Sequence, residues 1–161
     1  MARLLIVHHS PTPTVQSLTD AVVAGAGDDA ISGVEVVVRA ALEASADDVL
    51  AADGVLLGTT ANFGYMSGAL KHFFDSIFLE AGGALTDDGS ASGGGGGRLP
   101  WGLWVHGRYD TTGAVRSVES IVGALPWRQA APVLSVVGDV GEAERASAYE
   151  LGGTIAALLS D

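Results

Sequence analysis

The sequence predicts an α/β domain in which a parallel sheet is covered by helices on both faces. Short, nearly continuous apolar runs alternate along the chain with stretches whose apolar residues recur at helical spacing. Continuous apolar runs are typical of strands buried on both sides, and right-handed crossovers place the connecting helices on both faces of such a sheet. With 161 residues, 48% of them hydrophobic, the chain suits a single domain over residues 1–161 with its own core.

Five strand-and-helix units account for the pattern. Apolar runs predict strands at 4–7, 34–38, 54–58, 101–105 and 133–137. Helical spacing predicts helices over 15–26, 66–78, 114–125 and 151–159, with a cap near Ser67 and a further short helix capped by Ser45. Residues 81–100 break this rhythm, and the five glycines at 93–97 carry no side chains that could build an element. We expect a glycine-rich surface loop there.

The composition disfavours several classes of partner. A formal net charge of -11, with only eight lysine and arginine residues, opposes binding to nucleic acid or to an anionic membrane. No apolar run reaches the roughly 20 residues that span a bilayer, and the amino terminus passes directly into a strand without a signal-peptide pattern, so we expect a cytoplasmic protein. Because the chain contains no cysteine, redox chemistry would need a bound cofactor.

Common catalytic and metal-binding motifs do not occur in the sequence. No Gly-x-Gly-x-x-Gly follows the first strand, and no Gly-x-Ser-x-Gly is present. His8 and His9 are adjacent on or just after a strand, so their side chains should point to opposite faces and not share a metal. His106 ends a neighbouring strand, where it is either close to a cofactor or, as we favour, a satisfied polar residue at a strand end. We therefore expect no metal site and assign no catalytic side chain.

The loop after the first strand offers donors for a phosphate group. Ligands of open α/β sheets bind beyond the carboxyl ends of the strands. Here the hydroxyls of Ser10, Thr12 and Thr14 precede the amides of Val15 and Gln16 at a helix start. Hydroxyls and a helix amino terminus can hold a phosphate without a nearby cation. An ordinary capped loop explains the same residues equally well, because Ser and Thr are common at helix starts.

The loop after the third strand carries a longer motif. From Gly58 to Asp75 it reads GTTANFGYMSGALKHFFD. A glycine-threonine turn, Phe-Gly-x-Met-x-Gly, Lys and Phe-x-Asp recur at this spacing in flavodoxin-like FMN-binding proteins. The sequence most resembles the WrbA-like NAD(P)H:quinone oxidoreductases and the NADPH-dependent FMN reductases of that group.

This resemblance implies a flavodoxin-like three-layer sandwich whose five-stranded parallel sheet has the order 2-1-3-4-5. It also implies that the turn passes along the isoalloxazine ring of FMN, with contacts from Thr60, Ala61, Asn62, Phe63, Gly64 and Tyr65. The alternative is that Phe63, Tyr65 and Met66 only cover the core.

By the same resemblance, the loop after the fourth strand faces the pyrimidine side of the ring. The residues expected to contact the cofactor there are Gly107, Arg108, Tyr109, Asp110 and Gly113. The family has a glycine-rich loop at this place, so Arg108 and Tyr109 depart from its pattern. In the first loop, Pro13 stands where flavodoxins usually carry glycine, which removes one backbone donor.

The resemblance implies an FMN-dependent oxidoreductase that accepts hydride from NADH or NADPH and reduces a quinone or another small acceptor. A second hypothesis is a flavodoxin-type electron carrier or a flavin-storage protein, whose negative charge would suit docking to a basic redox protein. A third is the same fold without a flavin. The sequence is compatible with a monomer or a homo-oligomer, and it does not separate enzyme from carrier.

Overall fold

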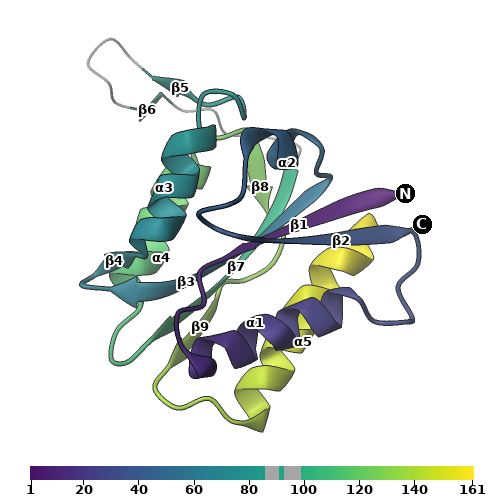
Figure 1. Cartoon of the computed structure of the whole chain (residues 1–161), viewed down its shortest axis with the longest axis vertical. Helices are drawn as coiled ribbons and strands as arrows, with labels where there is room; N and C mark the ends of the chain where they lie inside the picture. The colour runs from purple at the N-terminus through teal and green to yellow at the C-terminus, as the bar shows by residue number, and fades with distance from the viewer. Residues whose placement is uncertain (86–90, 93–98) are drawn as a thin grey trace.

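The structure, a computed structural model, describes residues 1–85, 91–92 and 99–161 (Figure 1). The glycine run predicted to form a surface loop, 93–97, lies outside the described residues. Two short strands precede the glycine run, β5 (Ala84–Leu85) and β6 (Ala91–Ser92), and they pair in an antiparallel sheet of their own. An interruption of the strand-and-helix rhythm was expected from 81 to 100, but the next long strand already begins at Leu99.

A mainly parallel sheet forms the centre of the molecule (Figure 1). Its elements are β1 (Ala2–His8), β2 (Val34–Ala40), β3 (Gly54–Asn62), β4 (Tyr65–Met66), β7 (Leu99–Gly107), β8 (Trp127–Gln129) and β9 (Leu134–Val137). The strand path is β2-β1-β3-β7-β8, while β9 also pairs with β7 and β4 pairs antiparallel with β3. The predicted parallel sheet is therefore present, with additional strands.

The strand predicted at 133–137 is β9, and a further short strand that was not predicted, β8, also pairs with β7. β8 pairs with the beginning of β7, where Gln129 lies opposite Trp101, and β9 pairs with its end, where Leu134 lies opposite Trp104. The segment between Gln129 and Leu134 is longer than the segment of β7 between Trp101 and Trp104, so it cannot pair continuously with β7. It includes Pro132, which has no amide hydrogen to donate to a ladder. The predicted five-strand order 2-1-3-4-5 is therefore not exact, because β8 and β9 both pair with β7 and β4 is added beside β3.

Helices cover both faces of the sheet, as predicted. The helices are α1 (Pro13–Ala26), α2 (Ala46–Leu50), α3 (Gly68–Ile77), α4 (Thr112–Val122) and α5 (Glu142–Leu159). α1 and α5 pack on one face and α3 and α4 on the other (Figure 1). Met66, expected in a helix, belongs to β4, because the helix begins after its cap Ser67. α4 ends before Leu125, and α5 starts well before Leu151.

Close packing on the α1/α5 face depends on glycines. A Cβ on Gly58 of β3 would lie 2.0 Å from the indole of Trp104, whose side chain is fully buried. A Cβ on Gly152 of α5 would lie 2.0 Å from the carbonyl oxygen of Val22 in α1. The two helix backbones and the Trp104 ring therefore approach as closely as they do only because side chains are missing at these points.

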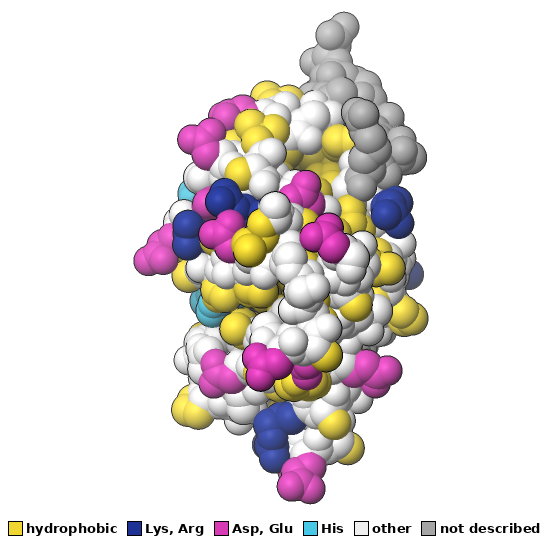
Figure 2. Space-filling view, turned by 90° about the vertical axis from the view of Figure 1, so that its right-hand side faces the viewer, with side chains coloured by type: hydrophobic (Ala, Val, Ile, Leu, Met, Phe, Trp, Pro, Cys, Tyr) yellow, Lys and Arg dark blue, Asp and Glu magenta, His cyan; other side chains and the backbone are white. Residues whose placement is uncertain are grey.

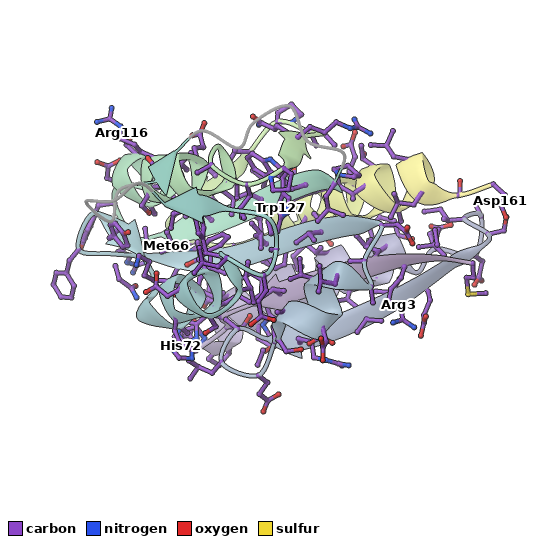
Figure 3. All side chains as sticks on the ribbon, turned by 90° about the horizontal axis from the view of Figure 1, so that it is seen from above. Arg3, Met66, His72, Arg116, Trp127 and Asp161 are labelled. Atoms are coloured by element: carbon purple, nitrogen blue, oxygen red, sulfur yellow. The ribbon has the colours of Figure 1, made fainter. Side chains whose placement is uncertain are left out.

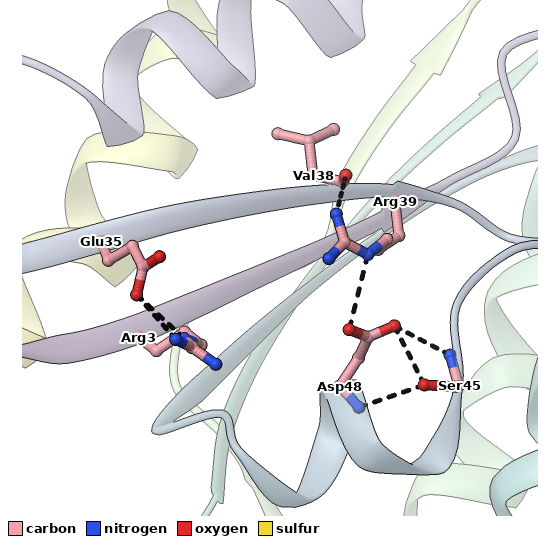
Figure 4. Close-up of polar contacts among 6 residues, drawn as sticks. All are labelled: Arg3, Glu35, Val38, Arg39, Ser45 and Asp48. Carbon is pink, nitrogen blue, oxygen red and sulfur yellow. Dashed lines mark hydrogen bonds and ion pairs between the residues drawn. The ribbon is translucent and has the colours of Figure 1, made fainter.

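Polar contacts fix the edge strand β2 and the short helix α2 (Figure 4). Arg3 of β1 forms an ion pair with Glu35 of β2 at 3.0 Å, and Arg39 of β2 pairs with Asp48 at 3.4 Å. Ser45 caps α2 and accepts from the Asp48 amide, while the Asp48 carboxylate accepts from the Ser45 amide. This capping box confirms the predicted cap.

Two ends of the molecule can be distinguished. Arg3 and Asp161 lie at the end where the parallel strands begin, and Met66 and Arg116 lie toward the opposite end (Figure 3).

Acidic side chains are spread over the face shown in Figure 2 rather than gathered in one patch. Within the described residues, no helix combines the length and apolar character that crossing a membrane requires.

Candidate functional site

An open groove of about 680 Å³ lies at the carboxyl ends of β1, β7 and β9. It is lined by Thr12, Pro13, Thr14, Ser17, His106, Arg108, Gly138, Asp139 and Val140. One side of the groove is the first turn of α1, and the other is formed by the residues that follow β7 and β9. The groove therefore lies where an open α/β sheet binds its ligands.

Some polar residues of the first loop line the groove, and others bond toward the interior. Thr12 is the N-cap of α1, and its hydroxyl accepts from the Val15 amide at 3.3 Å. Ser10 is turned inward instead: its Oγ lies 2.8 Å from His8 Nδ1 and 2.6 Å from Thr19 Oγ1. Burial, and next the neighbouring His9, lower the pKa of His8, which favours its neutral form. The hydrogen bonds of Ser10 to His8 and Thr19 therefore fix the start of the loop against β1 and α1.

A buried hydroxyl near the groove has no hydrogen-bond partner. Thr60 Oγ1, near the end of β3, is such an atom among the described residues. Thr60 lies opposite His106 in the parallel pairing of β3 with β7. His106 lines the groove, and its Nε2 lies 2.7 Å from the Gly138 carbonyl oxygen. Because buried hydroxyls usually have a partner, the unpaired Thr60 oxygen is a feature that a bound donor would satisfy.

The predicted ring-contact turn is a tight hairpin between β3 and β4. Asn62 pairs with Tyr65, and the two central residues, Phe63 and Gly64, have φ values of 51° and 78°. Positive φ at both positions is typical of two-residue turns between twisted strands, but it is strained for a phenylalanine. The Phe63 side chain is fully exposed. Strain at an exposed aromatic residue indicates a functional constraint rather than a packing need.

This hairpin packs against the start of α4. A Cβ on Gly113 would lie only 2.1 Å from the Gly64 carbonyl oxygen. The amide of Met66 donates to Ser117 Oγ of α4 at 3.1 Å. The second and third predicted loops are therefore held side by side, with Gly113 as the residue that lets the turn approach the helix.

The third loop is ordered by its own carboxylate. Asp110 Oδ1 accepts from the amide of Thr112 at 2.9 Å and from its hydroxyl at 2.8 Å, and these bonds lower the pKa of Asp110. Arg108 reaches across to Asp139 in the loop after β9, at 3.3 Å. Tyr109 points to solvent, with 89% of its surface exposed.

The structure brings together only part of the predicted site. Thr12, Thr14 and Arg108 line the groove, and the hairpin turn lies beside Gly107 and Gly113. The other predicted residues of the first loop bond within the protein. Ser10 Oγ bonds inward, and the amides of Val15 and Gln16 donate to the hydroxyl and the carbonyl oxygen of Thr12.

Sequence reasoning missed the loop after β9. His106 lines the groove, and its Nε2 lies close to the Gly138 carbonyl oxygen, in agreement with a satisfied polar residue at a strand end. Gly138, Asp139 and Val140, which follow β9, line the groove as well. The signal was present, since these residues also follow an apolar strand of the same parallel sheet.

Comparison with solved structures shows what this architecture is. A flavodoxin from the domain Archaea superposes with a TM-score of 0.77 at 14% identity over 98% of both chains. The chain has a flavodoxin-like fold. A Streptococcus pneumoniae flavodoxin gives a TM-score of 0.75 at 19% identity, covering 98% of this chain and 99% of that one. The azoreductase of Bacillus anthracis gives 0.70 at 17% identity, covering 98% and 100% of the two chains.

Two curated proteins are homologues of this flavodoxin-like chain. One is named flavodoxin, from Aquifex aeolicus, and is 33% identical over 60% of this chain and 54% of its own length. The other is named NAD(P)H dehydrogenase (quinone), from Acidithiobacillus ferrooxidans, and is 30% identical over 70% of this chain and 62% of its own length. The chain therefore spans less than two thirds of each relative. No family model matches it.

Proposed function

We propose that this flavodoxin-like chain binds FMN along the carboxyl edge of its sheet. The observation that carries the proposal is the strained hairpin turn at Phe63 and Gly64, which packs on the start of α4. Strained backbone persists where surrounding structure holds it and is concentrated at ligand sites. The same residues carry the motif that resembles FMN-binding proteins.

The groove suits the phosphate and ribityl end of the cofactor. Thr12, Thr14 and Ser17 line it at the first turn of α1, where backbone amides and the helix dipole favour an anion. The unpaired hydroxyl of Thr60, whose neighbour in the sheet is the groove residue His106, would accept from a ribityl hydroxyl. Pro13 has no amide hydrogen, and the amides of Val15 and Gln16 donate to Thr12, so we assign the phosphate contacts mainly to the hydroxyls and the helix dipole. With these contacts the residues present fit the group.

The ring end of the cofactor would lie along the hairpin and the third loop. Backbone groups at 61–65 and 107–110 would contact its edge, and Gly64 allows a close approach because it has no side chain. FMN supplies the electron and hydride chemistry when bound, while the protein binds it, orients it and leaves one ring face accessible. No side chain is required as an acid or base.

For the reaction, we favour an oxidoreductase that takes electrons from NADH or NADPH and passes them through FMN to a quinone or another small acceptor. Support comes from the motif at 58–75 and from the homologue named NAD(P)H dehydrogenase (quinone). We place this activity in the cytoplasm, with a homo-oligomer as a further option for its assembly.

A second candidate is an electron carrier or flavin store with little turnover of its own. The net charge of -11 favours it, because an acidic surface speeds association with a basic redox protein. The homologue named flavodoxin supports it as well.

The two candidates differ in what the purified protein does with NADH and NADPH. We expect an oxidised flavin spectrum and rapid oxidation of one nicotinamide when a quinone is added. A stable semiquinone on partial reduction, with no faster nicotinamide oxidation than free FMN gives, would instead establish the carrier. Heat-treated protein with the same flavin content is the control for released cofactor.

A further inference from the structure

Arg108 and Asp139 lie on the same side of the groove, opposite the first turn of α1. Arg108 follows β7, Asp139 follows β9, and their side chains form an ion pair at 3.3 Å. Both also line the groove that contains the hydroxyls of Thr12 and Thr14. Among the described lining residues, Arg108 is the only lysine or arginine. The groove therefore contains one positive side chain in a strongly acidic molecule.

The ion pair with Asp139 is easy to replace. The Arg108 side chain is 66% exposed and that of Asp139 is fully exposed, and a single exposed ion pair stabilises a fold only slightly. Arg108 can therefore exchange the carboxylate for a better anion without disturbing the core. A phosphate group is a better partner, because it carries more charge and can accept two parallel bonds from a guanidinium.

We infer that Arg108 binds the phosphate group of FMN in this groove and that Asp139 holds the guanidinium there until the phosphate displaces it. The inference rests on the proposed function. Its physical reason is charge: the molecule carries -11, so an anionic cofactor approaches against repulsion, and one local cation offsets part of that cost. Hydroxyls and amides alone supply no net positive charge.

Flavin titrations of the full chain test this assignment, because riboflavin lacks the phosphate. For Arg108→Gln we expect FMN affinity to fall about tenfold while riboflavin affinity stays unchanged. For Asp139→Asn we expect FMN affinity to rise about two- to fivefold, because the competing carboxylate is gone. Raised salt should weaken FMN binding more in the wild type than in Arg108→Gln.

Matched controls make the same charge changes away from the groove. Arg116→Gln and Glu119→Gln alter exposed residues of α4 that line a different cavity, and both should leave the ratio of FMN to riboflavin affinity as in the wild type. An equal effect of Arg116→Gln and Arg108→Gln would overturn the inference, since only overall charge would then matter.

Other outcomes distinguish this inference from the proposed function. Unchanged FMN affinity in Arg108→Gln overturns the inference alone. Unchanged FMN affinity with weaker binding of NADH or NADPH would assign Arg108 to the donor nucleotide and also overturn it. If the wild type binds neither flavin, the proposed function fails and the inference fails with it.

Discussion

At the scale of single residues, two glycines at the hairpin should respond differently to the same substitution. In Gly113→Ala the new Cβ would lie 2.1 Å from the Gly64 carbonyl oxygen, so the turn must move away from α4. We expect FMN affinity to fall at least about tenfold, because a shift of about 1 Å at a binding site is costly. The domain should stay folded, since the turn is exposed.

Gly64→Ala tests conformation without a clash. Its Cβ would meet nothing within 4 Å, but a φ of 78° costs a non-glycine residue about 1–2 kcal/mol. We therefore expect a smaller loss of affinity than in Gly113→Ala. Gly68→Ala is the control, because its Cβ also meets nothing and its φ is not positive. If Gly113→Ala bound FMN as the wild type does, the hairpin would not line the ring.

A third residue, His8, gives a prediction about pH. Burial lowers its pKa below the value of about 6.5 that an unfolded chain shows. The unfolded chain therefore binds the proton first as pH falls. The stability associated with neutral His8 is present above the unfolded pKa and is lost as the pH falls from that value through the folded pKa. An NMR titration of the ring protons should give a folded pKa below that of a peptide containing 4–12; an equal or higher value would contradict the burial argument.

At the scale of elements, the contact of α1 with α5 should depend on Gly152 and not on its neighbour Gly153. Gly152→Ala would put a Cβ 2.0 Å from the Val22 carbonyl oxygen, so we expect the free energy of unfolding to fall by about 1–3 kcal/mol. Gly153→Ala meets its nearest atom at 3.4 Å and should be neutral or stabilising by up to about 1 kcal/mol. Urea unfolding of both variants measures the difference, and equal values would mean that the helices separate easily.

Most helices and strands could be predicted from the sequence, but the presence of both β8 and β9 beside β7 could not. Caps at Ser45 and Ser67 and the apolar runs of β1 and β3 follow from local chemistry, so the sequence is sufficient to find them. The division into β8 and β9 depends on how each of them pairs with β7. That pairing is tertiary structure, which local sequence does not determine. The same is true of Ser10, whose hydroxyl could face a ligand or, as observed, His8 and Thr19.

At the scale of the whole molecule, the resemblance at 58–75 predicted the flavodoxin-like fold, and the solved structures confirm that fold. The groove could be located only in part, because three strand ends from distant parts of the chain form it. Thr12, Thr14 and Arg108 were predicted from their loops, whereas Asp139 was missed because the loop after the last strand was not considered. The net charge of -11 also belongs to this scale, because it gives weight to Arg108, the one lysine or arginine among the described residues that line the groove.

The most direct test of the account is a titration of flavin-free protein with FMN, riboflavin and FAD, followed by flavin fluorescence. Under the proposed function, the hydroxyls and the helix terminus of the groove at α1 would hold one terminal phosphate, and backbone groups of the hairpin would contact the ring. We predict one FMN bound per chain, more tightly than riboflavin or FAD. Thr12→Ala with Thr14→Ala should cost about 2–4 kcal/mol of FMN affinity and leave riboflavin affinity nearly unchanged. If the protein quenches none of the three flavins, or binds riboflavin as tightly as FMN, the central claim of an FMN site with its phosphate in this groove is contradicted.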